Sequence, residues 1–108
     1  MNLVDATDLS RMQTSAAEAA AFLRLFANDR RLLVLCHLME GERSVTWLAE
    51  RVDLSPSALS QHLTRLRADR LVRTRREGQT IHYRLADARV ARLLGLLYEM
   101  FCEPGGAP

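Results

Sequence analysis

The sequence is poor in several residue types, and each scarcity excludes a class of protein. Its 108 residues include no lysine, two cysteines and 6% aromatic residues. No apolar run approaches the roughly 20 residues that span a bilayer. Residues 1–13 contain two aspartates and no apolar core of the kind that defines a signal peptide. We therefore expect a cytoplasmic protein with no membrane partner.

Signatures of catalysis and of metal binding are also missing. The chain has no nucleophile elbow, no glycine-rich phosphate loop and no carboxylate pair placed for acid–base chemistry. Three histidines and two cysteines are scattered along it, whereas zinc takes about four nitrogen or sulfur ligands in compact geometry. The sequence therefore predicts no enzyme, no cofactor and no metal site.

Positive charge, by contrast, is concentrated in the middle of the chain. Residues 43–86 carry nine arginines against four acids, a net charge of +5. Residues 1–42 carry four arginines against six acids, and residues 87–108 carry two against three. Such a concentration suits a phosphate-binding surface. It also argues against a domain that binds only protein.

Periodicity predicts a mainly helical domain with a small β-hairpin. We expect helices at 15–27, 29–40, 44–51 and 56–70, strands at 71–76 and 80–85, and a last helix at 87–102. Ser55 followed by Pro56 is a strong signal for a helix start. The order α-α-α-α-β-β-α is that of a winged helix-turn-helix over residues 14–102. Residues 1–13 and 103–108 are expected to be flexible tails.

The third and fourth helices are joined by about three residues, the spacing of a helix-turn-helix. Apolar and short polar side chains fall on different faces of the fourth helix, and short side chains allow close approach to base edges. A solvated surface face is the alternative for this helix, and a charged edge that prevents aggregation is the alternative for the hairpin. The expected DNA contacts are Ser55, Ser57, Ser60, Gln61, His62, Thr64 and Arg65 on the helix, and Arg73, Arg75, Arg76 and Gln79 on the hairpin.

The segments 54–67, 71–72, 75–78 and 83–85 resemble the ArsR/SmtB family of winged-helix repressors, and the likeness runs from about Ala17 to Cys102. The resemblance implies a symmetric dimer on a pseudo-palindromic operator, released when an inducer binds or modifies the protein. The last helix supports a homodimer independently, because it is apolar nearly all round and must be buried on both sides. The expected interface residues are Phe22, Val90, Leu93, Leu94, Leu97 and Phe101.

The two cysteines, Cys36 and Cys102, fall late in the second helix and at the end of the last. This placement resembles the persulfide-sensing BigR/SqrR-type branch of the family, which implies that a disulfide or polysulfide links them and releases DNA. We expect the two thiols of one protomer to lie close, slightly too far apart for a direct disulfide, which needs Cα atoms about 4.4–6.8 Å apart. Two alternatives remain. Cys36 shares its helix face with Leu32 and Met39, as an inert core thiol would, or the pair senses a thiophilic metalloid or an oxidant.

Overall fold

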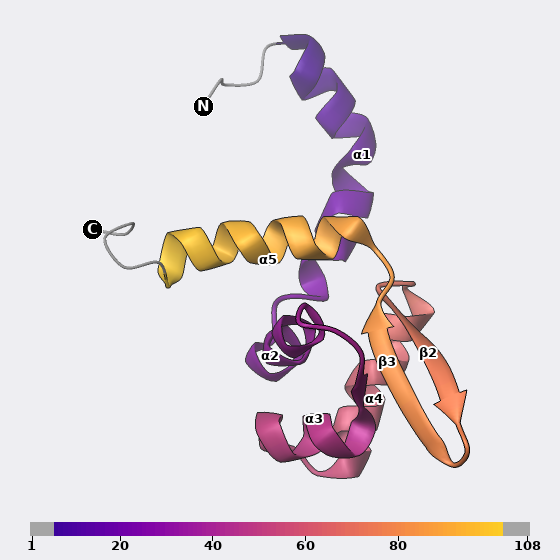
Figure 1. The fold of residues 1–108 in the computed structure, drawn as a ribbon. Helices are drawn as coiled ribbons and strands as arrows, with labels where there is room; N and C mark the ends of the chain where they lie inside the picture. The colour runs from indigo at the N-terminus through magenta and orange to yellow at the C-terminus, as the bar shows by residue number, and fades with distance from the viewer. Residues whose placement is uncertain (1–5, 103–108) are drawn as a thin grey trace.

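A computed structural model describes residues 6–102 of the chain (Figure 1). The element order is α1 (Ala6–Arg24), α2 (Asp29–Leu38), β1 (Arg43–Ser44), α3 (Val45–Val52), α4 (Pro56–Ala68), β2 (Val72–Glu77), β3 (Thr80–Leu85) and α5 (Ala88–Phe101). The helix-turn-helix consists of α3 and α4, and the β2–β3 hairpin forms the wing beside it. The predicted winged helix-turn-helix fold is confirmed.

Side-chain caps explain where four of the helices begin. A polar oxygen of the residue before each helix accepts a hydrogen bond from a backbone N–H of the first turn. The donor and acceptor pairs are Arg31 with Asn28, Trp47 with Ser44, Ala58 with Ser55, and Arg89 with Asp87. These starts agree with the sequence prediction to within one residue.

The sheet has three strands in the order β1-β3-β2, rather than the two strands of the predicted hairpin. Strand β1 pairs antiparallel with β3, with Arg43 opposite Tyr83. It was missed because two residues are too few to show an alternating pattern. Gly78, at φ +62, allows the tight turn between β2 and β3.

One apolar core lies under the helix-turn-helix, the wing and α5. Leu59, Leu63 and Leu66 of α4 are each fully buried. Helix α5 runs across the top of α2, and α4 lies behind the wing (Figure 1). Val90 and Leu94 of α5 point down into this core and are 0% and 4% exposed. The sequence placed these two residues in the dimer interface, whereas in the structure they pack in the core of one protomer.

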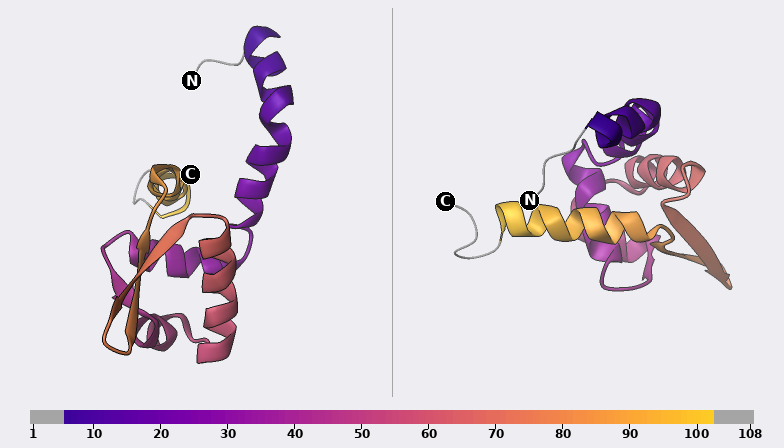
Figure 2. Two further views of the ribbon diagram at one scale, coloured as in Figure 1. Left: turned by 90° about the vertical axis from the view of Figure 1, so that its right-hand side faces the viewer. Right: turned by 90° about the horizontal axis from the view of Figure 1, so that it is seen from above.

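Helix α1 begins earlier than expected. Residues 6–13 are helical, and not the loose tail that was predicted, because they are mostly good helix formers with an acid in the first turn. None of the residues of α1 is buried, and its first half projects away from the rest of the protomer (Figures 1 and 2). The rest of the expected N-terminal tail and the expected C-terminal tail, residues 1–5 and 103–108, lie outside the described residues. No described helix is long and apolar enough to cross a bilayer.

Candidate nucleic-acid interface and thiol pair

Helix α4 presents a polar face to solvent because its leucines fix the opposite face in the core. The exposed residues of this face are Ser57, Ser60, Gln61, Thr64 and Arg65. Short hydroxyl and amide side chains on an exposed helix can approach base edges, and glutamine can bond adenine through two hydrogen bonds. The structure brings together five of the seven residues that the sequence assigned to this helix.

The other two residues, Ser55 and His62, have structural partners. The Ser55 hydroxyl accepts a hydrogen bond from Ala58 N–H at 3.2 Å and caps the helix. His62 is half-buried, and its Nδ1 lies 3.3 Å from Nη1 of Arg31. His62 therefore faces the protein more than the solvent.

Two neighbouring arginines of α2 hold both helices of the helix-turn-helix. Arg30 Nη1 donates to the Val52 carbonyl at the end of α3, at 3.2 Å. Arg31 is buried, and it donates from Nε to the Leu25 carbonyl at 2.7 Å and from Nη2 to the Arg24 carbonyl at 2.9 Å. Its third partner is His62 of α4. A single side chain thus joins the end of α1, the start of α2 and α4.

The Arg31–His62 contact requires a neutral histidine with its proton on Nε2. Desolvation by burial, followed by the positive charges of Arg31 and Arg65, lowers the pKa of His62. Burial and the charge of Arg65 also lower the pKa of Arg31. Protonation of His62 would remove the acceptor and set two cations side by side.

The wing exposes Arg73, Arg76 and Gln79, but Arg75 is held by acids. Arg75 Nη2 and Nε donate to Oε1 of Glu42 at 2.6 and 3.0 Å, and Nη1 lies 3.6 Å from Glu77. The hydrogen bond from Arg75 lowers the pKa of Glu42, and the same contact raises that of Arg75. Arg75 therefore fastens the wing to the segment before β1, and its charge is already balanced in the free protein.

Sequence reasoning also missed a cluster around the only tryptophan, Trp47 of α3. The guanidinium carbons of Arg43 and Arg51 lie 4.4 and 4.0 Å from its ring centre, and His37 meets it edge-on at 5.3 Å. Cation–π contacts of this kind hold flexible arginine side chains in place. The i, i+4 spacing of Trp47 and Arg51 was the available signal, whereas the approach of Arg43 and His37 depends on tertiary packing.

The two thiols are both free and exposed, Cys36 on α2 and Cys102 at the end of α5. Partial burial raises the pKa of Cys36, and the negative charge of Cys102 raises it further. The second effect requires the two sulfurs to lie within electrostatic reach of one another. The thiols are thus on the same side of one protomer, with Cys36 on the helix that holds the helix-turn-helix.

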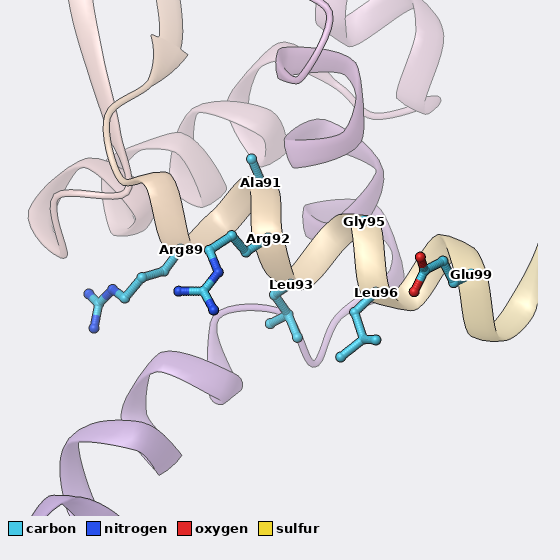
Figure 3. A pocket seen from close by; sticks show the side chains of 7 residues that line it. All are labelled: Arg89, Ala91, Arg92, Leu93, Gly95, Leu96 and Glu99. Atoms are coloured by element: carbon cyan, nitrogen blue, oxygen red, sulfur yellow. The ribbon is translucent and has the colours of Figure 1, made fainter. Parts of the chain in front are cut away.

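Helices α1 and α5 keep large apolar side chains in solvent. Phe101 is 76% exposed, and the others are Leu9, Met12, Leu23, Leu96, Tyr98 and Met100. Of the predicted interface residues, Leu93 and Leu97 are half-buried, and Phe22 is partly covered by Phe26 and by the guanidinium of Arg89. A shallow hollow of about 620 Å³ follows the outer side of α5, lined by Arg92, Leu93, Gly95 and Leu96 among others (Figure 3). Nothing lies within 4 Å of the position a Cβ would take at Gly95.

The fold and the exposed face of α4 define a winged helix-turn-helix DNA-binding protein. A family model of bacterial regulatory proteins, the arsR family, matches residues 28–74. The transcriptional activator HlyU of Vibrio cholerae is 45% identical over 96 residues, which is 89% of this chain and 89% of HlyU. The chain belongs to the ArsR family and is a DNA-binding transcriptional regulator.

Solved structures of relatives agree with this assignment. HlyU has a TM-score of 0.80 at 46% identity and covers 85% of this chain and 100% of its own. The transcriptional repressor BigR from Xylella fastidiosa has a TM-score of 0.82 at 38% identity, with 87% and 96% covered. The antimony-specific transcriptional repressor AntR has a TM-score of 0.70 at 36% identity, with 89% and 81% covered.

Proposed function

We propose that this regulator is a homodimeric repressor that binds a pseudo-palindromic operator and releases it when a reactive sulfur species links Cys36 to Cys102. The observation that carries the sensing step is the pair of exposed thiols within electrostatic reach of each other. The observation that carries DNA binding is the polar face of α4 beside the arginines of the wing.

The exposed apolar side chains of α1 and α5 support the dimer. None of the residues of α1 is buried within the protomer, and a helix so exposed is marginally stable alone in water. A second copy related by a two-fold axis would cover Leu9, Met12 and the outer side of α5. It would also set the two DNA-reading helices about 34 Å apart, one turn of DNA.

The chemistry of the switch needs only a persulfide as oxidant. Because the pKa of Cys36 is raised, we assign the first attack to Cys102. Cys102 takes the outer sulfur of a persulfide RSSH and releases RSH. The Cys36 thiolate then attacks the inner sulfur of the Cys102 persulfide and expels H₂S. The balance is two protein thiols and RSSH giving one disulfide, RSH and H₂S. Alternatively, Cys36 takes the outer sulfur of a second RSSH and releases a second RSH. The outer sulfur of the Cys102 persulfide then attacks the inner sulfur of the Cys36 persulfide and expels H₂S, which leaves a trisulfide.

Helix α2 supplies a route from the thiols to the DNA. A bridge between Cys36 and Cys102 ties α2 to α5, and Arg30 and Arg31 of α2 hold α3 and α4. A shift of α2 against α5 would therefore change the angle of the DNA-reading helix. A coupling of about 1–3 kcal/mol would lower operator affinity roughly 5–150-fold.

The decisive experiment measures operator affinity by fluorescence anisotropy before and after glutathione persulfide. We expect wild type to lose affinity and to regain it with dithiothreitol, while Cys36→Ser and Cys102→Ser bind DNA normally and do not respond. Met39→Leu, which removes an exposed sulfur at the C-terminal cap of the same helix, is the matched control and should respond like wild type. The proposal fails if both serine variants still release DNA.

A metalloid sensor is the second candidate, because AntR is described as antimony-specific and a pair of free, exposed thiols can bind a trivalent metalloid. Mass spectrometry after separate treatment with persulfide, peroxide and arsenite separates the options. Added sulfur or a cross-link formed with persulfide at lower doses than with peroxide supports the persulfide sensor. An intact arsenic adduct that alone releases DNA supports the metalloid sensor.

A further inference from the structure

The ring of Trp47, on α3, is contacted by side chains from three different elements. The guanidinium carbon of Arg43, at the start of β1, lies 4.4 Å from the ring centre, and that of Arg51, one turn further along α3, lies 4.0 Å away. The imidazole of His37, in the last turn of α2, meets the ring edge-on, with 5.3 Å between the ring centres. We call these four residues the Trp47 cluster.

The Trp47 cluster begins one residue after a thiol. His37 follows Cys36 directly in α2, and successive residues of a helix point about 100° apart. Cys36 is therefore exposed, while His37 is half-buried and its ring faces α3. The imidazole forms no hydrogen bond or ion pair within residues 6–102. Its position is thus set by the backbone of α2 and by the ring of Trp47.

The cross-link of the proposed sensor would act on this end of α2. Helix α2 lies between α3 and α5, whose C-terminal cap is Cys102 (Figures 1 and 2). A bond that joins Cys36 to Cys102 pulls on the last turn of α2, and a displacement of this turn moves His37 relative to Trp47. The two arginines of α2 that contact α3 and α4 lie in its first turn, at the opposite end of the helix.

We propose that the contact between His37 and Trp47 transmits the cross-linking of Cys36 to α3, the first helix of the helix-turn-helix. The inference rests on the proposed sensing function and names the side chains that carry its signal. Helix α3 packs against α4, and Arg43 joins the same ring to β1, which pairs with the wing strand β3. A displaced Trp47 ring therefore affects both the reading helix and the wing. His37 acts through Trp47 and is a positioning residue.

The first test compares His37→Ala with His37→Phe. Alanine removes the contact with Trp47, whereas phenylalanine keeps an aromatic ring that can meet Trp47 edge-on. Both variants should bind the operator about as tightly as wild type before treatment, because Arg43 and Arg51 still contact the ring. Each protein is then treated with glutathione persulfide until its intact mass shows complete cross-linking, and its operator affinity is measured again by fluorescence anisotropy.

We expect the loss of operator affinity on cross-linking to be smaller in His37→Ala than in wild type by about 2–12-fold, the effect of one edge-to-face aromatic pair on an equilibrium constant. His37→Phe should lose affinity as wild type does. The proposal is overturned if cross-linked His37→Ala loses as much affinity as cross-linked wild type, or if His37→Phe responds like His37→Ala. If cross-linking leaves the operator affinity of wild type unchanged, the proposed sensing function fails instead.

The second test uses the fluorescence of Trp47, the only tryptophan of the chain, in protein without DNA. Cross-linking should change the emission spectrum of wild type, because the imidazole moves relative to the indole ring, and dithiothreitol should reverse the change. The change should be smaller in His37→Ala. A wild-type spectrum that is the same before and after complete cross-linking would overturn the proposal. A change of equal size in His37→Ala would assign the effect to the new sulfur bridge itself and would overturn it as well.

Discussion

Replacement of Arg31 by methionine tests whether one buried side chain organises the DNA-reading unit. Methionine keeps the aliphatic stem that packs in the interior and removes the guanidinium. Three acceptors then lose their donor: the carbonyls of Arg24 and Leu25 and Nδ1 of His62. A buried acceptor left unpaired costs about 1–3 kcal/mol.

The destabilisation is partly offset because the variant no longer buries a cation, whose desolvation is itself unfavourable. We therefore expect the free energy of unfolding to fall by about 2–4 kcal/mol, which is a large share of the 5–15 kcal/mol typical of a domain. At about 4–8 °C per kcal/mol, the melting temperature should fall by roughly 8–32 °C. Urea unfolding at one fixed protein concentration is the appropriate assay, since dimerisation makes stability depend on concentration.

Arg30→Met is the matched control. Arg30 is the neighbouring residue, is only half-buried and donates one hydrogen bond, to the Val52 carbonyl. Its replacement should cost about 1 kcal/mol. If Arg31→Met destabilises the protein no more than Arg30→Met does, the reasoning about the buried junction is wrong.

Four other residues, His62, Gln61, Arg76 and Phe101, are the subjects of the remaining predictions. The pKa of His62 is lowered from its ordinary value of 6.5, so the unfolded chain binds the proton more readily than the folded protein does. The contribution of neutral His62 to stability should therefore be complete above about pH 6.5. It should be lost as the pH falls through the lower pKa of the folded state. The difference in unfolding free energy between wild type and His62→Asn, measured by urea titration from pH 8 to 5, should therefore shrink as the pH falls, and a constant difference would contradict it. Gln61→Ala should reduce the discrimination between bases by about 1–3 kcal/mol at one operator position, whereas Arg76→Ala should weaken binding to all sequences alike. Affinities for a panel of single-base operator variants distinguish the two effects. Equal losses at every position for Gln61→Ala would rule out base reading by this residue. Phe101→Glu places a charge on the most exposed apolar side chain of α5, so sedimentation should show monomers at concentrations where wild type is dimeric; a variant dimer of unchanged affinity would remove Phe101 from the interface.

Local signals in the sequence determined most of the fold. The capping residues Ser44, Ser55 and Asp87 act within their own first turn, so the starts of α3, α4 and α5 could be predicted without any tertiary contact. The leucines of α4 repeat at helical spacing, which predicted that they face the core and that the polar face opposite them is exposed to solvent. The clustering of arginines in the middle of the chain, which the sequence alone shows, indicated a phosphate-binding surface.

Tertiary structure alone decided which of the expected residues are free to act. Arg75 and Arg76 are neighbours of the same type, but Glu42, 33 residues away, pairs with Arg75 and not with Arg76. Val90 and Phe101 look alike in an apolar helix, but the packing of α5 on the core of the protomer buries the first and leaves the second 76% exposed. Arg31, remote in sequence from His62, became the link between α1 and the reading helix. Burial and ion pairing depend on residues far apart in the chain, whereas helix caps and hydrophobic periodicity depend on residues close in sequence. For this reason the sequence predicted the helices and strands better than it predicted the contacts of their side chains.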